Sequence, residues 1–321
     1  MACRKCNSTN NVDEWGLCLQ CTNVTCSNCG GEKSYHSQLC GPCEKNWQGW
    51  NIELDTQPDI TDVIVNTLNL AKLKPEYINV LLDHKHVYEK VFTSRTYNRN
   101  ENYEILEFIG DGILNSFVRF YIYRRFPFLD CTYGVKILDQ LRKNYVSKKT
   151  FSTIADNLGF WPYIRASDAQ KQTDKPSLLE DVLEAFIGAT VKILDEIYVV
   201  GVGHGVVNEL MKSIFDKIHI SLEYSDLYDP RSILKEIFDS AKNQLGVLKY
   251  VDGNRESTVY RVFQGKQIFM GVGKELPQKA DRQQEAARQA LKLFPREEEE
   301  RRRLHNLVIA ECGAIVNART Q

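Results

Sequence analysis

Two apolar segments, each interrupted by acidic residues, constrain the fold of this chain more than any other feature. The first spans residues 102–115, NYEILEFIGDGILN, and spaces Glu104, Glu107 and Asp111 three and four residues apart. A helix would therefore align the three acids on one face. Ionised carboxylates are rarely buried without a cation or a hydrogen-bonding partner. Because the segment contains no Lys or Arg, its acids require a divalent metal, a basic side chain from elsewhere, or solvent.

The second acidic segment, LLEDVLEAFIGATVKILD, begins at Leu178 and repeats this pattern. Asp181 and Glu184 are three residues apart and share a helix face, with Glu180 beside them. Two such helices can pack so that their acids meet in a four-carboxylate cage. The two segments together favour a metal site over a solvated acidic face.

Composition and charge limit the remaining choices. The 321 residues exceed one ordinary domain, and 43% hydrophobic residues suffice for a packed core in one or more domains. A formal net charge of −1 gives no global positive field, so nucleic-acid contact must come from local patches. No apolar run reaches the roughly 18 to 20 residues that span a bilayer, and no signal-peptide core follows Met1. We expect a soluble intracellular protein with no membrane partner, in the cytoplasm, the nucleus or an organelle.

Eight of the ten cysteines lie within the first 43 residues as four CxxC pairs. Two such pairs supply the four thiolates of a tetrahedral site, so the segment predicts two Zn²⁺ ions per chain. The alternative is a disulfide framework, which is typical of small secreted domains. Sequential and crossed pairing both remain open, and the module could contact RNA or dock onto a protein. Cys131 and Cys312 are isolated, and we expect them to be inert packing residues. The eight expected zinc ligands are Cys3, Cys6, Cys18, Cys21, Cys26, Cys29, Cys40 and Cys43.

Residues 229–294 predict the order helix, three strands, helix. Asp229 can cap the first helix, with Pro230 at its first position. Twelve Lys or Arg against eight Asp or Glu leave this segment with an excess of positive charge, as phosphate contact requires. Beyond it, a charge run can form a salt-bridged helix whose apolar end could dock on a partner, although a solvated tail is the default expectation.

The two acidic segments resemble the signature regions of the ribonuclease III family. EILEFIGDGILN is similar to the family's ERLEFLGD motif, and LLEDVLEAFIGA is similar to its LADxVEALIGA motif. Between them, LDQLRKNYVSKKTFSTIADNLGF follows the pattern LTxLRxxxVSNxxLAxIAxxLGL, and TSRTY stands where THRSY is usual. The likeness covers residues 60–220, and residues 229–294 resemble the double-stranded-RNA-binding domain that the family commonly appends.

This resemblance implies a helical, metal-dependent endonuclease for double-stranded RNA that works as a dimer. We expect a homodimer, with a heterodimer with another ribonuclease III-like subunit as the alternative. Glu107, Asp111, Asp181 and Glu184 match the catalytic carboxylates that would hold two Mg²⁺ (or Mn²⁺) ions per active site. Glu104 matches a supporting glutamate on the RNA and dimer side. The expected products carry 5′-phosphate and 3′-hydroxyl ends with a short 3′ overhang.

The chain departs from the family pattern in both domains. The RNA-binding-like domain lacks the usual GPxH-like loop, and its basic cluster is reduced to Lys279 and Arg282, although Glu236 matches the first-helix acid. We therefore expect weak RNA binding, with a domain kept mainly for protein contacts as the alternative. The departures in the nuclease motifs remove no expected metal ligand and fall at Ser94, Ile105, Gly112 and Glu180.

The sequence thus predicts a multidomain chain. One alternative is that the protein is an accessory, non-catalytic subunit of an RNA-processing complex. The intact set of four carboxylates argues against this alternative. A pure RNA-binding module is another, and it leaves two acidic clusters in apolar helices unexplained. The expected parts are a double zinc-ribbon module (1–50), an all-α ribonuclease III endonuclease domain (51–224), an α+β double-stranded-RNA-binding-like domain (225–295), and a charged, amphipathic C-terminal tail (296–321).

Overall fold

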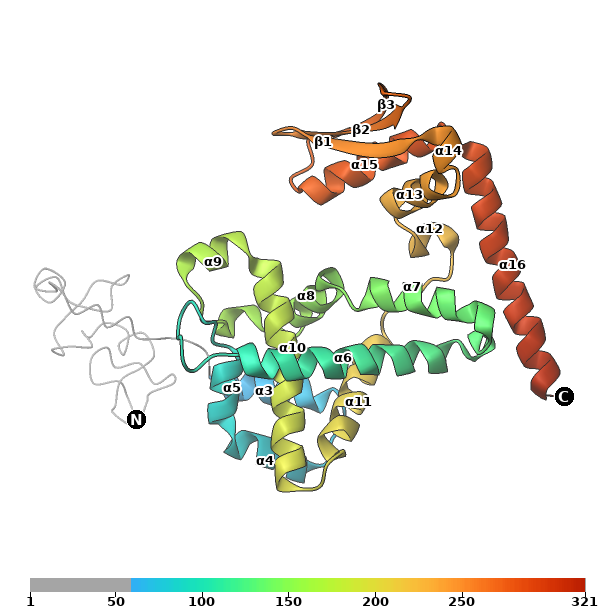
Figure 1. Ribbon diagram of the computed structural model, residues 1–321. Helices are drawn as coiled ribbons and strands as arrows, with labels where there is room; N and C mark the ends of the chain where they lie inside the picture. Colours follow the sequence, from blue (N-terminus) through green and yellow to red (C-terminus); the bar gives the residue numbers. More distant parts are fainter. Residues whose placement is uncertain (1–58, 321) are drawn as a thin grey trace, which may run out of the picture. The chain divides into compact units, whose positions relative to one another are not determined.

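The structure is a computed structural model that describes residues 59–320. The eight cysteines predicted to bind zinc lie outside these residues. Along the described chain, a helical part comes first and a smaller part with three strands follows it (Figure 1). The helical part consists of α3 (Ile60–Asn69), α4 (Pro75–Asp83), α5 (Lys85–Val91), α6 (Glu104–Arg125), η1 (Pro127–Leu129), η2 (Thr132–Gly134), α7 (Val135–Tyr145), α8 (Lys148–Asn157), η3 (Trp161–Tyr163), α9 (Asp168–Thr173), α10 (Lys175–Ile197), α11 (Val202–Phe215) and α12 (Tyr224–Leu227).

Helices α6 and α10 cross and contact each other in the centre of the helical part (Figure 1). Both predicted acidic helices are therefore confirmed as helices. The middle of α10 is buried on nearly every side, as its apolar sequence requires. Tyr88 of α5 and Phe160 pack on it through Phe186, with ring centroids 5.1 and 5.3 Å from the Phe186 ring. No helix within residues 59–320 is both long enough and apolar enough to cross a membrane.

Two glycines set the distance between α6 and α10. A Cβ atom on Gly110 would lie 1.7 Å from the carbonyl oxygen of Glu184. A Cβ atom on Gly188 would lie 2.0 Å from the carbonyl oxygen of Leu106. Only glycine permits so close an approach of two backbones. The crossing point thus places the backbone of Glu184 directly against the α6 turn that carries Glu107 and Asp111.

The chain that enters α6 is held by backbone hydrogen bonds to the segment after η3. Thr93 and Arg165 form an isolated parallel bridge. The amide of Arg165 donates to the carbonyl of Phe92 at 2.7 Å, and the amide of Ser94 donates to the carbonyl of Arg165 at 2.8 Å. The Thr93 carbonyl also accepts the amide of Tyr103 at 3.0 Å. These bonds fix the start of α6 relative to the residues that lead into α9.

The smaller part confirms the predicted order of helix, three strands and helix, with one extra helical turn before the first strand. Its strands form an antiparallel sheet in the order β1-β2-β3, and α15 packs on β2 and β3. The Asp229 side chain caps the first helix by accepting the amides of Arg231 and Ser232 at 3.1 Å each. The elements are α13 (Pro230–Ser240), α14 (Lys242–Leu245), β1 (Val247–Asp252), β2 (Glu256–Phe263), β3 (Lys266–Lys274) and α15 (Lys279–Leu291).

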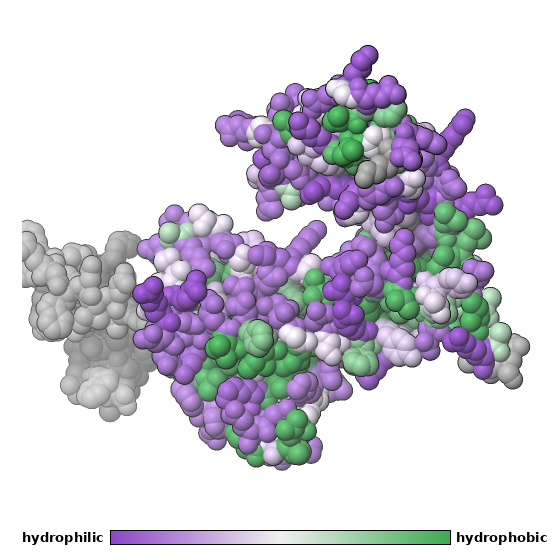
Figure 2. Space-filling view, in the orientation of Figure 1, coloured by the Kyte–Doolittle hydropathy of each residue, from purple (hydrophilic) through white to green (hydrophobic). Residues whose placement is uncertain are grey.

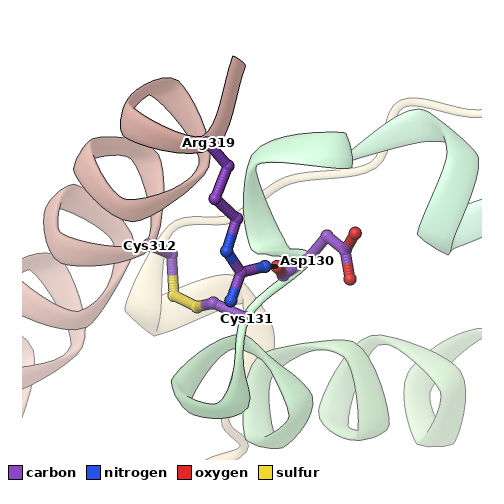
Figure 3. The surroundings of a disulfide bond; sticks show 4 residues. All are labelled: Asp130, Cys131, Cys312 and Arg319. Atoms are coloured by element: carbon purple, nitrogen blue, oxygen red, sulfur yellow. Dashed lines mark hydrogen bonds between the residues drawn. A yellow bond between two sulfur atoms is a disulfide. The ribbon is translucent and has the colours of Figure 1, made fainter. Parts of the chain in front are cut away.

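The C-terminal segment forms a long helix, α16 (Pro295–Thr320), that contacts η1, η2, α12 and α13. The expectation of a solvated tail is wrong for these residues. Cys312 is fully buried and forms a disulfide with Cys131, and the Arg319 guanidinium donates to the carbonyl of Asp130 at 3.0 Å (Figure 3). The two cysteines are therefore not isolated. They are 181 residues apart in the sequence, so no local pattern could pair them.

Candidate active site

The acidic segments approach each other where α6 and α10 cross, closely enough for the charge of Asp181 to act on Glu107 and that of Asp111 to act on Glu184. Glu107 and Asp111 extend from consecutive turns of α6, and Asp181 and Glu184 from consecutive turns of α10. Glu184 is only 8% exposed, while Glu107 and Asp181 are half-buried and Asp111 is exposed. Glu104 lies one turn before Glu107 and is exposed. The site therefore runs from a buried carboxylate to an open acidic surface.

The electrostatics of the site are those of crowded, partly buried anions. Burial, followed by the charge of Asp181, raises the pKa of Glu107 to about 7. Burial raises the pKa of Glu184 to about 8, with the charges of Asp111 and Glu180 next in importance. Burial also raises the pKa of Asp181, to about 6. In each case the ionised carboxylate is disfavoured, so the site would be stabilised by a cation.

Basic side chains reach only the edges of this cluster. Lys148, the first residue of α8, lies 3.3 Å from the carboxylate of Glu180 and donates to the Ser177 hydroxyl at 2.6 Å. Arg95 lies 3.9 Å from the carboxylate of Glu104. In the described part of the chain, no ion pair joins a basic side chain to any of the four expected metal ligands. Within residues 59–320, basic side chains thus pair with Glu104 and Glu180 of this cluster, and the alternative to a metal applies to these two acids alone.

The four carboxylates offer the hard oxygen ligands that Mg²⁺ and Mn²⁺ prefer. Within residues 59–320, no group of three or more His, Cys, Asp or Glu side chains is arranged so that it could hold a metal ion. The chemical type of the four ligands fits a divalent cation, and so do the raised pKa values of Glu107, Asp181 and Glu184.

One residue close to the carboxylates was missed by the sequence analysis. The hydroxyl of Tyr103, the residue before α6, donates to Oδ2 of Asp181 at 3.0 Å. The only signal in the sequence is an aromatic residue immediately before the acidic helix. The partner of its hydroxyl lies 78 residues away, where no pattern indicates it.

The three predicted RNA-contact residues of the smaller part are all engaged within the protein. Arg301 of α16 donates to the Glu236 carboxylate at 2.9 Å and to the Glu236 carbonyl at 2.8 Å. Lys279 lies 2.8 Å from the carboxylate of Asp252. Arg282 is 9% exposed and donates to the carbonyls of residues 276 and 277 at 2.7 and 3.0 Å. An RNA contact by Glu236 or Lys279 would thus have to compete with an internal partner.

The fold and the site together define a helical domain with a cluster of acids at its central helix crossing. The Ribonuclease III domain family model matches residues 104–192, which include all of α6 and α10 as far as Lys192. A ribonuclease 3-like protein of Frog virus 3 (isolate Goorha) is 42% identical over 231 residues, or 71% of this chain and 61% of the relative. A ribonuclease 3-like protein of Invertebrate iridescent virus 6 is 32% identical over 257 residues, or 74% of this chain and 87% of the relative.

The chain belongs to the ribonuclease III family, a family of endoribonucleases. It spans less than two thirds of the length of the Frog virus 3 relative. Among solved structures, the nuclease domain of ribonuclease III from Campylobacter jejuni matches with 26% identity and a TM-score of 0.38, over 49% of this chain and 98% of that one.

Proposed function

We propose that the protein is an Mg²⁺-dependent endoribonuclease for double-stranded RNA that works as a dimer in RNA processing. It leaves 5′-phosphate and 3′-hydroxyl ends with a short 3′ overhang. The observation that carries the proposal is the close approach of the acidic helices α6 and α10, where burial and the charges of neighbouring acids raise the pKa values of Glu107, Asp181 and Glu184. Such a cluster of oxygen ligands gains most from a hard divalent cation.

Glu107, Asp111, Asp181 and Glu184 would hold Mg²⁺ or Mn²⁺, two ions per active site. When bound, the ions supply an activated water and stabilise the charge that develops on the phosphate and the leaving 3′ oxygen. The residues of the chain orient these ions, and the buried position of Glu184 keeps bulk water from the deep end of the site. Glu104, at the open end, supports RNA or the second subunit rather than acting as a primary ligand.

The dimer proposal is supported by an exposed apolar surface on α6. Ile105 is 70% exposed and Phe108 is 80% exposed, each directly after an acid of the site. A groove of about 680 Å³ begins beside them and is lined by Ile109, Ile113 and Phe120, among others. Figure 2 shows hydrophobic residues gathered over the face on which α6 lies in Figure 1. A second copy of this helix would cover apolar side chains that otherwise face water. A heterodimer with another ribonuclease III-like subunit is the alternative.

The other proposed ligands follow from the sequence. The smaller part would bind double-stranded RNA weakly, through Glu236, Lys279 and Arg282 where these exchange internal partners for RNA. The eight N-terminal cysteines would bind two Zn²⁺ ions in ribbons that contact RNA or protein. Elemental analysis of the folded protein should give two zinc ions per chain, and a clear deficit would rule out the double zinc ribbon.

Cleavage of a perfect RNA duplex by the purified protein with Mg²⁺ tests the proposed function. Glu184→Gln should abolish cutting and leave duplex binding intact, because it removes one charge without changing the shape of the side chain. Glu196→Gln is the matched control, since it is the same change in the same helix at a side chain that is 62% exposed and paired with Lys192. If the wild type cuts no duplex, alone or with candidate partners, the enzymatic function is wrong and an accessory role in an RNA-processing complex takes its place.

A further inference from the structure

Tyr103 connects the two acidic helices through one buried side chain. It is 2% exposed, and its hydroxyl donates to Oδ2 of Asp181 on α10. Its carbonyl accepts the amide of Glu107 at 2.9 Å, in the first turn of α6. Tyr103 thus bonds both acidic helices. Its backbone bonds the first turn of α6, and its hydroxyl bonds a carboxylate of α10.

The backbone of Tyr103 is also held by the segment that precedes it. Its amide donates to the carbonyl of Thr93, which belongs to the segment held by the parallel bridge. The next residue, Ser94, donates from its hydroxyl to the Gln170 side chain of α9 at 2.9 Å. Thr96 donates to the same oxygen at 2.6 Å. These hydrogen bonds hold the segment to which the backbone of Tyr103 is bonded.

A hydrogen bond from a fixed donor restricts what a half-buried carboxylate can do. A tyrosine hydroxyl ordinarily keeps its proton well above neutral pH, so the phenol of Tyr103 can donate to Asp181. Because Oδ2 accepts this bond, the bond sets the rotation of the carboxylate and thus the direction in which the other oxygen, Oδ1, points. Residues that orient a metal ligand in this way typically change metal affinity about 10- to 100-fold when they are lost.

We propose that Tyr103 is a positioning residue of the acidic site, whose hydroxyl holds Asp181 in the orientation that presents its other oxygen to a divalent cation. This inference rests on the proposed function, because it assigns a role in the same site. Tyr103 acts through Asp181 and touches neither the cation nor the RNA.

The test is Tyr103→Phe, which removes only the hydroxyl, in the full, zinc-loaded chain. Tyr88→Phe is the matched control. The Tyr88 hydroxyl is also buried and also bonds a side chain of α10, the hydroxyl of Thr190 at 2.8 Å, but it does not contact the acids. Both variants lose one buried hydrogen bond to the same helix. A purely structural effect should therefore appear in both.

The primary measurement is Mn²⁺ affinity by isothermal titration calorimetry. Tyr103→Phe should bind Mn²⁺ about 10- to 100-fold more weakly than the wild type, and Tyr88→Phe should bind it as the wild type does. In cleavage assays, Tyr103→Phe should raise the Mn²⁺ concentration needed for half-maximal rate by the same factor and lower the maximal rate less. In an Asp181→Asn background, Tyr103→Phe should cause no further loss.

Two outcomes would overturn the positioning role, and they are distinguishable from a failure of the proposed function. Equal Mn²⁺ affinity of Tyr103→Phe and the wild type would show that the hydroxyl does not orient a ligand. Equal losses in Tyr103→Phe and Tyr88→Phe would show a general effect of weakening the packing of α10. If Asp181→Asn binds Mn²⁺ as tightly as the wild type, the metal site itself is wrong, and the role of Tyr103 is refuted with it.

Discussion

Replacing Glu184 by Gln should stabilise the metal-free protein at alkaline pH. Burial, with the charge of Asp111 next, raises the pKa of Glu184 from 4.5 to about 8. At about 1.4 kcal/mol per pKa unit, holding this carboxylate ionised in the folded protein costs about 5 kcal/mol. Solvent reaches part of the site and screens the charges, which reduces the expected cost to about 2 to 3 kcal/mol. Gln occupies the same volume without a charge, so the variant avoids this cost.

The pH dependence follows from the direction of the shift. The folded-state pKa of Glu184 is higher than the unfolded-state value, so the unfolded chain loses its proton first as the pH rises. Glu184 therefore costs no stability below pH 4.5, costs progressively more between pH 4.5 and about 8, and reaches its full cost above that. The difference in unfolding free energy between variant and wild type should grow over the same range.

Urea unfolding followed by circular dichroism, without added Mg²⁺, measures this difference. Glu184→Gln should equal the wild type near pH 4.5 and exceed it by about 2 to 3 kcal/mol near pH 9. Adding Mg²⁺ near pH 9 should stabilise the wild type more than the variant, because the wild type keeps all four ligands. The exposed control Glu196→Gln should show neither effect. A variant that is less stable than the wild type near pH 9, or a difference that does not change with pH, would refute the reasoning.

Three further substitutions test other parts of the structure. Gly188→Ala should destabilise the protein by about 3 kcal/mol or more in thermal unfolding, because its Cβ would lie 2.0 Å from a carbonyl oxygen of α6. The control is Gly205→Ala, whose Cβ meets nothing within 4 Å, and it should raise the free energy of unfolding by up to about 1 kcal/mol. Phe108→Asp should shift the protein from dimer to monomer in sedimentation equilibrium while its circular dichroism spectrum stays that of the wild type, and an unaltered dimer would show that α6 is not the interface. Cys312→Ser should lower the melting temperature under oxidising conditions, since a disulfide closing a loop of this length contributes up to about 5 kcal/mol; equal stability of oxidised and reduced wild type would contradict this.

The sequence predicted the parts of the site that depend on local spacing. Glu107 and Asp111 are four residues apart, and Asp181 and Glu184 are three apart, so helical periodicity alone places each pair on one face. The sequence also indicates that the two acidic faces meet, because two apolar helices that each carry an acidic pair can share a bound cation. The order of helix, three strands and helix also followed from local signals, such as the Asp229 cap before Pro230.

What the sequence did not predict depends on contacts between distant residues. The hydroxyl of Tyr103 carries no periodic signal, and its partner, Asp181, lies 78 residues away in the sequence. Cys131 and Cys312 fell outside the CxxC pattern and were set aside as inert, because pairing across 181 residues requires the fold. The helix α16 was indicated by its charge run, but the partners of that helix are distant in the sequence, such as Glu236 for Arg301 and Asp130 for Arg319.

The glycine contact between α6 and α10 has a consequence for how this active site can vary. Interlocking side chains usually set the spacing of two helices, so that the spacing drifts whenever the core is repacked. At Gly110 and Gly188 no side chain intervenes, and the distance between helices is a contact of main chain with main chain. The separation of the acids at this crossing is thus set by the main chain rather than by the size of nearby core side chains. A redesigned core could exchange leucine for isoleucine or phenylalanine around the site and still present the acids at the same distance.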